Sequence, residues 1–214
     1  MPAGPTAETL EPELPAGFAP GLEDAGIGPN QAAEGVYPHA AVMVLQLTDA
    51  AAMALRVNGD GRTMADEILC SAQKFAEGCR IPYLKLVGNE LFAAAGLSGQ
   101  SDGAPARIAD VALSIRDRCM DLFEEMDHAP AFRIGIDCGL ALGSRLGASP
   151  EIFNLWGDAV QTADVMASSA LPSTVQVTEA TYRRLRRDFL FRPRGRFYVP
   201  RVGEAQTFIL ASRS

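Results

Sequence analysis

A helix followed closely by a strand is encoded in residues 108–138, IADVALSIRDRCMDLFEEMDHAPAFRIGIDC. Apolar side chains recur there at three- and four-residue steps and would share one helix face: Ile108, Val111, Ala112, Ile115, Cys119, Leu122, Phe123 and Met126. From residue 132 the period changes to two, which places one set of side chains on a single side of a strand: Phe132, Ile134, Ile136 and Cys138. The two periods together predict a helix that packs on one face of a sheet.

The segments before this pair extend it into a larger pattern. Residues 42–47 read as a largely buried strand, and residues 63–78 read as a helix with apolar side chains at helical spacing. Residues 83–87 and 90–93 read as two strands around a tight turn. The order β-α-β-β-α-β is that of a ferredoxin-like sandwich, in which helices cover one face of an antiparallel sheet.

Further elements are expected after this core. Residues 139–147 are rich in glycine and are interpreted as an excursion between elements. A helix is expected from Gly157, a strand at 174–177, a helix from Glu179, and then a terminal pair of strands. The sequence therefore predicts an α+β domain: a ferredoxin-like βαββαβ core with C-terminal additions.

The first 36 residues differ from the rest in composition. They hold six of the 14 prolines, six of the 20 glycines and six acidic residues, with no Lys or Arg and no hydrophobic period. Such a segment buries too little apolar surface to offset the entropy lost on ordering. Residues 1–36 are therefore interpreted as a flexible acidic leader or linker (the acidic leader below), and residues 37–214 as one domain.

Charge and apolar content exclude several classes of protein. The formal net charge is −7, but the residues after the acidic leader hold 20 acidic and 19 basic side chains, which argues against a nucleic-acid binder. No apolar run reaches the roughly 18–20 residues of a membrane helix, and no signal-peptide pattern follows Met1. A cytoplasmic protein without membrane insertion is expected. The cysteines have no metal-binding spacing and are interpreted as reduced core thiols: Cys70, Cys79, Cys119 and Cys138.

Four segments, in this order, resemble the class III nucleotidyl cyclase homology domain, the adenylate and guanylate cyclase family. They are Leu47–Met53, Lys85–Glu90, Phe132–Gly139 and, as the most specific, Phe153–Ala163 with Val175–Tyr182 downstream. The resemblance covers roughly residues 40–211 and implies the nucleotide cyclase fold. It also implies dimers with active sites across the subunit interface. There the ribose 3′-hydroxyl of ATP or GTP attacks the α-phosphate, releasing pyrophosphate and a 3′,5′-cyclic nucleotide.

The resemblance implies two Mg²⁺ or Mn²⁺ ions on two aspartates of one chain. Asp49 stands at the first position, although a frame shifted by one residue places Thr48 there, and Asp49 also suits an N-cap. Asn89 stands at the second position and lowers the formal charge of the site from −2 to −1. An Asn89-Glu90 pair that only shapes a hairpin turn explains the sequence equally well. The expected cofactor is Mg²⁺ or Mn²⁺ if a nucleotide binds, and none otherwise.

The nucleotide-binding positions are partly kept. Lys85 matches the base-reading lysine, and Asn154 stands where its aspartate partner belongs, although Lys85 is alternatively an exposed strand lysine. Ala52 replaces the glycine of the phosphate-cradling turn, where a methyl group crowds the approach of N–H groups to phosphate. The phosphate-binding lysine position holds Pro200, and the adjacent Arg201 is the candidate replacement.

The two catalytic positions implied by the resemblance are both substituted. Gln161 replaces an asparagine and is one methylene longer, and Val165 replaces an arginine. A valine offers no charge and no donor to the phosphoryl group in the transition state. Loss of a comparable arginine in phosphoryl transfer costs about 10³–10⁵ in rate.

These substitutions favour a degenerate, regulatory cyclase-like signalling domain, inactive or slow on its own. It is expected to form a homodimer, or a heterodimer with another cyclase-type chain, and to bind a purine nucleoside triphosphate but no nucleic acid. An active adenylate or guanylate cyclase with a divergent site is the alternative. A pure protein-interaction module is the second alternative.

Two further features stand outside the cyclase motifs. A basic run is expected to be a solvated helix face and strand, or else an electrostatic contact with a partner or with the acidic leader: Arg183, Arg184, Arg186, Arg187, Arg192, Arg194 and Arg196. Trp156, the only tryptophan, is expected to pack in the core.

Overall fold

The computed structural model describes residues 32–57, 61–98, 103–149, 151–199 and 203–214. Most of the acidic leader, and Arg201, lie outside these residues. The elements in chain order are β1 (Gly35–Leu47), α1 (Ala50–Met53), α2 (Met64–Gly78), β2 (Tyr83–Val87), β3 (Glu90–Ala95), α3 (Ala104–Glu125), β4 (Phe132–Leu146), β5 (Ile152–Trp156), α4 (Asp158–Ser169), β6 (Val175–Thr178), α5 (Glu179–Leu185), β7 (Phe189–Val199) and β8 (Gly203–Arg213).

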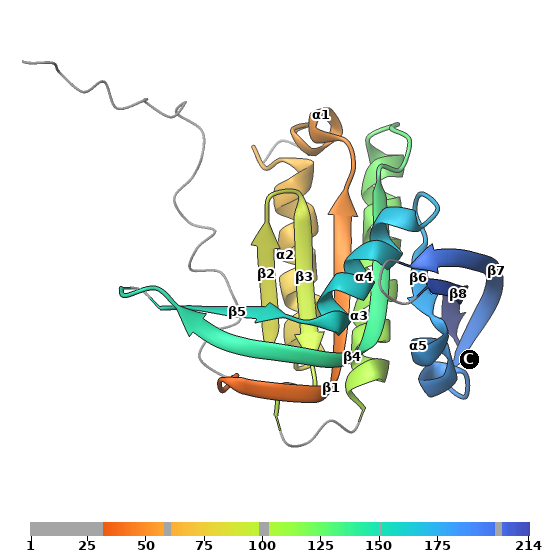
Figure 1. The fold of residues 1–214 in the computed structure, drawn as a ribbon. Helices are drawn as coiled ribbons and strands as arrows, with labels where there is room; N and C mark the ends of the chain where they lie inside the picture. Colours follow the sequence, from red (N-terminus) through yellow and green to blue (C-terminus); the bar gives the residue numbers. More distant parts are fainter. Residues whose placement is uncertain (1–31, 58–60, 99–102, 150, 200–202) are drawn as a thin grey trace, which may run out of the picture.

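All strands belong to one sheet (Figure 1). Strands β2, β3, β1 and β4 lie side by side in that order, and each neighbouring pair is antiparallel. This is the ferredoxin-like half, and the predicted α+β fold is confirmed. Strand β6 joins β4 in parallel, and β8 and β7 continue the sheet. Strand β5 pairs with the far half of β4.

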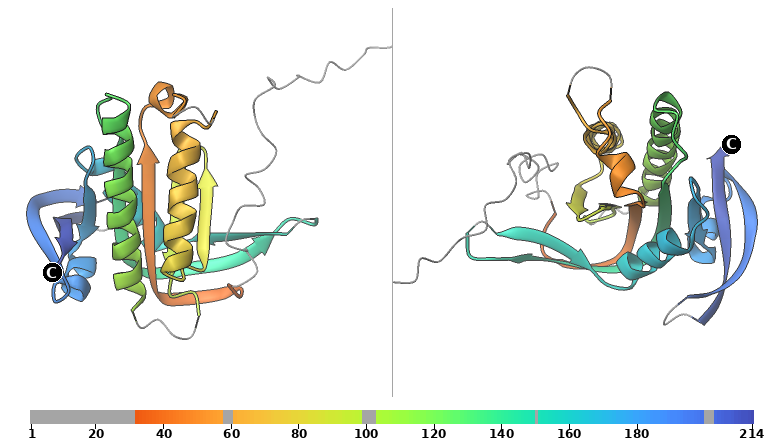
Figure 2. Two further views of the ribbon diagram at one scale, coloured as in Figure 1. Left: turned by 180° about the vertical axis from the view of Figure 1, so that it is seen from behind. Right: turned by 90° about the horizontal axis from the view of Figure 1, so that it is seen from above.

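The two faces of the sheet carry different helices (Figure 2). Helices α2 and α3 cover one face and enclose the larger core, with Met43 and Leu45 of β1 at its centre. Helix α4 covers the other face, where Val42 and Val44 pack against its alanines. Strand β1 is buried on both faces, which is why residues 42–45 form an apolar run rather than an alternation.

Local sequence signals set the starts of the two long helices. Thr63 and Asp66 form a capping box, in which each side chain accepts from the other residue's backbone N–H. Helix α3 begins after Gly103, whose φ of 77° a glycine adopts without strain, and Pro105 follows in the first turn. Both helices match the predicted periodic segments.

Helix α4 approaches β4 at a distance that only glycine allows. A Cβ atom at Gly135 would lie 2.1 Å from the Ala163 carbonyl oxygen and 2.2 Å from the Ala167 nitrogen. The small residues facing it on α4 are buried: Ala159, Ala163 and Ala167. This close contact fixes α4 over the sheet and so fixes the positions of Gln161 and Val165.

Three expectations need correction. Residues 139–147 are not an excursion, because β4 continues to Leu146 and pairs with β5 in a long hairpin. Gly143 serves packing there, since a Cβ atom would lie 2.4 Å from the Phe153 ring. Trp156 is 38% exposed at the end of β5, so it does not pack in the core. All four cysteines are free thiols, but only Cys119 and Cys138 are fully buried.

Candidate functional site

A pocket of about 180 Å³ opens on the face of the sheet that carries α4. Lys85 of β2 and Asn154 of β5 supply its polar groups. The rest of the lining is apolar or aromatic: Val42, Tyr83, Val87, Phe92, Leu155 and Val160. Two polar groups in an otherwise apolar pocket suit a flat heteroaromatic ring whose edge forms hydrogen bonds.

Lys85 and Asn154 are directly bonded to each other. The Lys85 ammonium donates to the Asn154 amide oxygen at 2.5 Å, and the Asn154 amide nitrogen donates to the Ile152 carbonyl at 3.1 Å. Partial burial lowers the pKa of Lys85 from its ordinary value. A lysine ammonium has three donors, so two remain for acceptors on a ligand.

Tyr83 forms the floor of this pocket and stays neutral. Its ring meets the Phe153 ring edge-on at 5.8 Å between centroids. Burial raises the pKa of Tyr83 to about 12. The pocket therefore carries one positive charge, that of Lys85.

Asp49 caps the short helix that follows β1. One carboxylate oxygen accepts from the backbone N–H groups of Ala51 and Ala52, at 2.9 and 3.1 Å. The other oxygen lies 3.8 Å from Nε2 of His128. The cap interaction occupies the Ala52 N–H, and the Ala52 side chain is buried. Asp49 thus has one oxygen committed to backbone and one directed towards a histidine.

Asn89 lies at the β2–β3 turn, beside the end of β1. Its side-chain nitrogen donates to the Leu47 carbonyl at 2.8 Å, and its backbone carbonyl accepts from the Leu47 N–H at 2.9 Å. An aspartate could not make the first of these bonds, because a carboxylate has no donor. Asn89 and Asp49 therefore lie at the same end of β1, and the amide of Asn89 also fastens the turn.

These residues fit a two-metal site poorly. Mg²⁺ prefers several anionic oxygens in near-octahedral geometry, whereas Asp49 is the one carboxylate at the two matched positions and half of it caps a helix. Within the described ranges, no three His, Cys, Asp or Glu side chains gather in a way that could hold a metal ion. Any cation bound here would depend mainly on the phosphates of a nucleotide.

The two positions matched to catalytic residues lie one turn apart on α4. Gln161 is exposed, and Val165 is partly buried. The backbone carbonyl of Val165 accepts from the hydroxyls of Ser168 and Ser169 at 3.1 and 2.7 Å. The valine side chain contributes neither charge nor hydrogen bond to this surface.

The sequence interpretation missed a carboxylate pair beside these positions. The Gln46 side-chain nitrogen donates to Glu90 of β3 and to Asp164 of α4, both at 2.9 Å. Burial and the neighbouring Asp164 raise the pKa of Glu90. Gln46 interrupts the apolar run of β1, and this polar residue in a buried strand was the available signal. Glu90 of β3 and Asp164 of α4 thus share the Gln46 amide as their hydrogen-bond donor.

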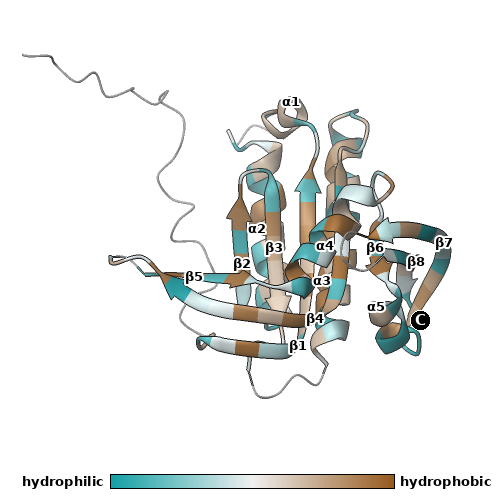
Figure 3. Ribbon diagram, in the orientation of Figure 1, coloured by the Kyte–Doolittle hydropathy of each residue, from teal (hydrophilic) through white to brown (hydrophobic). Residues whose placement is uncertain are grey.

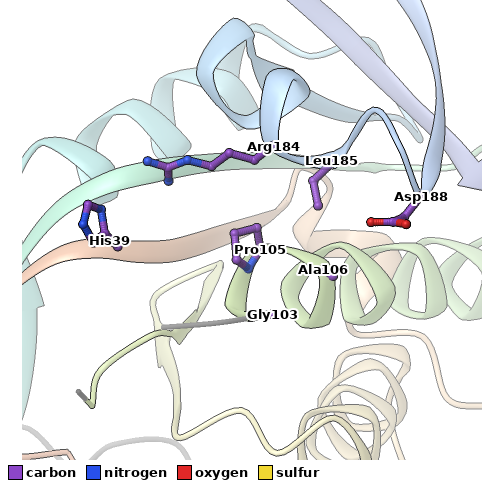
Figure 4. A pocket seen from close by; sticks show the side chains of 7 residues that line it. All are labelled: His39, Gly103, Pro105, Ala106, Arg184, Leu185 and Asp188. Carbon is purple, nitrogen blue, oxygen red and sulfur yellow. The ribbon is translucent and has the colours of Figure 1, made fainter. Parts of the chain in front are cut away.

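A second, larger pocket of about 380 Å³ lies elsewhere, between the start of α3 and the end of α5. His39, Arg184 and Asp188 are the charged or titratable side chains around it (Figure 4). None of the predicted site residues that the structure describes lines it.

The structure thus groups the predicted residues in three places. Lys85 and Asn154 share one pocket. Asp49, Ala52 and Asn89 lie at the end of β1, and the remaining pair, Gln161 and Val165, lies on α4.

A sequence model described as the Adenylate and Guanylate cyclase catalytic domain matches residues 38–212. The chain belongs to this family. The cyclase domain is 27% identical over 130 residues to an adenylate cyclase of Mycobacterium tuberculosis, a match that covers 61% of this chain and 29% of the relative. It is 29% identical over 155 residues to human guanylyl cyclase C, covering 69% of this chain and 14% of the relative. The matched region is thus less than a third of the length of either relative.

Solved cyclase structures share the fold. The guanylate cyclase domain of RhGC from Catenaria anguillulae, solved in complex with GTP, superposes with a TM-score of 0.73 at 19% identity, covering 84% of this chain and all of that one. The adenylyl cyclase CyaB from P. aeruginosa superposes with a TM-score of 0.67 at 15% identity, covering 83% and 96%. Within the described part of the cyclase domain, no helix is both long and apolar enough to cross a membrane.

Proposed function

We propose that this cyclase domain is a regulatory pseudo-cyclase, which dimerises, binds a purine nucleoside triphosphate weakly and turns it over slowly or not at all. The observation that carries the proposal lies on α4. There an uncharged Val165 stands at the position matched to the catalytic arginine, and the neighbouring Asp164 adds a carboxylate that bonds to Gln46.

Electrostatics support the loss of turnover. The family reaction needs fixed positive charge around a phosphoryl group that becomes more negative in the transition state. Here the groups at and next to the matched positions are neutral or acidic: Gln161, Asp164, Val165, Asn89 and Glu90. A polyanionic triphosphate at this surface would meet repulsion where the reaction requires attraction.

The base-binding side supports retained nucleotide binding. Lys85 and Asn154 are held in one pocket with an aromatic floor. Asn154 both donates and accepts hydrogen bonds, unlike the matched aspartate, so the pair offers little to distinguish adenine from guanine. We therefore expect ATP and GTP to bind with similar, low affinity.

Exposed apolar side chains support dimerisation. They lie on the start of β1, the far half of β4 and β5: Val36 (63% exposed), Leu140 (41%), Leu146 (56%), Ile152 (49%) and Trp156 (38%). The strands that carry them are paired with one another, and exposed apolar side chains on neighbouring strands are typical of protein interaction sites. We call these five residues the apolar arm, and a second cyclase-type chain is its proposed occupant.

Restoring the missing groups tests the proposal. The triple variant Asn89→Asp, Gln161→Asn, Val165→Arg is expected to form cyclic nucleotide from Mn²⁺-ATP or Mn²⁺-GTP about 10³-fold faster than the natural chain, because the arginine alone is worth about 10³–10⁵. The measurement is cyclic nucleotide formed per unit time by mass spectrometry. The matched control replaces Val165→Arg by Ser168→Arg, which adds the same charge one turn along α4.

Further results distinguish a pseudo-cyclase from an active cyclase with a divergent site. Asp49→Ala in the restored variant should abolish the gained activity if Asp49 contributes to the metal site. Equal activity of the triple variant and the Ser168→Arg control would contradict the proposal. A natural chain that already turns over at ordinary rates would indicate an active cyclase with a divergent site.

A further inference from the structure

One side of the domain concentrates positive charge outside the cyclase site. Residues 179–199 contain seven arginines and two acidic residues, Glu179 and Asp188. The arginines lie on α5 and just after it, and on β7: Arg183, Arg184, Arg186, Arg187, Arg192, Arg194 and Arg196. We call this surface the basic edge. Hydrophilic segments on α5 and β7 are visible in Figure 3.

Aromatic rings hold α5 against β7 and β8, so the arginines of the basic edge lie at one end of the sheet. Tyr182 of α5 stacks on Phe208 of β8 at 4.0 Å and meets Phe191 of β7 edge-on at 5.2 Å. Strand β7 is the last strand of the sheet, so one of its sides has no neighbouring strand in the described structure. Its ends also expose Leu190 (55%) and Tyr198 (73%).

Few of these arginines are neutralised within the described residues. Arg183 pairs with Glu179 at 2.6 Å, and Arg184 lies near Asp137 and Cys138. No ion pair is found in the described part of the chain for the other five: Arg186, Arg187, Arg192, Arg194 and Arg196. Like charges this close together cost stability unless an anion approaches them.

Arg194 gives the most specific indication of an absent acceptor. It lies at a bulge between Pro193 and Gly195, where the pairing of β7 with β8 shifts. Its guanidinium covers the Phe197 ring at 4.1 Å from the centroid. Its Nε and Nη1 atoms are buried and have no hydrogen-bond acceptor among the described residues. Buried guanidinium donors without acceptors are costly.

The chain itself holds a segment of matching charge. Residues 1–36 carry six carboxylates and no basic side chain: Glu8, Glu11, Glu13, Glu23, Asp24 and Glu34. We infer that the acidic leader of the same chain docks on the basic edge, with carboxylates of residues 8–13 bound to the arginines of β7. This inference does not depend on the proposed cyclase function.

The leader is long enough to reach. Its last residues are anchored at β4, where the Arg145 guanidinium donates to the Ala32 carbonyl at 3.3 Å. The chain from residue 32 back to Glu8 can extend by up to about 80 Å, whereas a domain of this size is about 40 Å across. Tethering keeps the effective concentration of the leader high, so individually weak contacts suffice.

Arginine modification by phenylglyoxal, followed residue by residue with mass spectrometry, tests this inference on the full chain. The variant Glu8→Gln, Glu11→Gln, Glu13→Gln removes three negative charges from the leader and substitutes no residue of the domain. We expect Arg192 and Arg196, both exposed, to react about threefold faster in this variant than in the natural chain, because a tethered leader bound about two-thirds of the time protects to that extent. The exposed Arg80 should react equally in both.

A matched control neutralises three exposed carboxylates of the domain, Glu77→Gln, Asp121→Asn and Glu124→Gln, and should leave the reaction rates of Arg192 and Arg196 unchanged. The difference should also vanish at about 1 M salt, where charges are screened within roughly 3 Å. Equal rates in the natural chain and the leader variant would overturn the inference. Equal rates are expected if the leader does not cover the basic edge and this surface instead binds an anionic lipid or RNA. Protection that increases with protein concentration would assign the leader of a second copy and would also overturn it.

Discussion

The side chain of Gln46 connects the strand that follows Asn89 with the helix that carries Val165. Its amide nitrogen bonds to Glu90, the neighbour of Asn89, and to Asp164, the neighbour of Val165. The matched metal and catalytic positions are thus linked through two carboxylates rather than through positive groups. In the proposed pseudo-cyclase, the site thus carries these carboxylates and lacks the matched arginine and one matched aspartate.

The base pocket provides a prediction for Lys85. Lys85→Ala should weaken binding of ATP and GTP by about tenfold or more, because a hydrogen bond from a charged group contributes about 1.5–3 kcal/mol. Calorimetric titration measures the dissociation constants. Lys74→Ala, at an exposed lysine of α2, is the matched control and should leave binding unchanged. Equal affinities for Lys85→Ala and the natural chain would place the nucleotide outside this pocket.

Asp137 provides a prediction for the pH dependence of stability. Burial raises the pKa of this carboxyl above its ordinary value of 3.8, although it accepts from the Thr178 hydroxyl at 2.5 Å. The folded state therefore binds this proton more tightly than the unfolded state does. The carboxyl's favourable contribution to stability is present at low pH and is lost as the pH rises through the raised pKa.

Asp137→Asn lacks this titration. Its free energy of unfolding, relative to the natural chain, should therefore increase as the pH rises from about 4 to 7. Urea unfolding at a series of pH values measures the difference. Asp121→Asn, at an exposed residue of α3, is the control for replacing a carboxylate by an amide without burial. A difference that stays constant with pH for Asp137→Asn would contradict the assignment.

Sequence reasoning at this scale located the individual positions but not their interactions. Lys85 and Asn154 were matched by motif, and the structure adds that they bond to each other. The contacts of Gln46 with Glu90 and Asp164 join residues 44 and 118 positions apart. No local period encodes such contacts, because they depend on how α4 crosses the sheet.

At the scale of elements, the contact of α4 with β4 is the most restrictive. Gly135→Ala should destabilise the domain by about 3 kcal/mol or more, because the new methyl group would overlap the α4 backbone rather than a movable side chain. Urea unfolding measures the loss. Gly78→Ala, where a Cβ atom meets nothing within 4 Å, is the matched control and should be neutral or slightly stabilising. Equal stabilities would contradict the close packing of α4.

The hairpin of β4 and β5 shows where periodicity misleads. Its glycines suggested a loop, but Gly143 allows Phe153 and Tyr37 to pack against the strand. The helices and the first strands were predicted well because their apolar periods are long and their caps are local. The hairpin was not, because a glycine required for packing cannot be distinguished by sequence from a glycine required for a turn.

The apolar arm provides a prediction for assembly. Leu146→Ser with Ile152→Ser should weaken self-association by about tenfold or more, since each buried aliphatic side chain contributes about 1.5–3 kcal/mol. Sedimentation velocity over a concentration series measures the dissociation constant. Leu171→Ser, at a residue 48% exposed outside the arm, is the control. An unchanged constant would exclude the arm from the interface.

At the scale of the whole molecule, the cyclase fold is shown, and the loss of the charges that the reaction requires is our proposal. Residues 38–212 match the family, and the fold superposes on cyclase domains over more than four-fifths of the chain. The proposed loss of catalysis is compatible with this fold, because the fold depends on buried apolar contacts, whereas catalysis depends on a few exposed polar groups.

The turnover number of the natural chain tests this account most directly. It should be measured with saturating ATP or GTP and Mn²⁺, at protein concentrations high enough to populate a dimer. The account predicts nucleotide binding without significant product, at least about 10³-fold below the 1–10³ s⁻¹ of ordinary enzymes. Cyclic nucleotide formed within that ordinary range, and lost in Asp49→Ala, would contradict it.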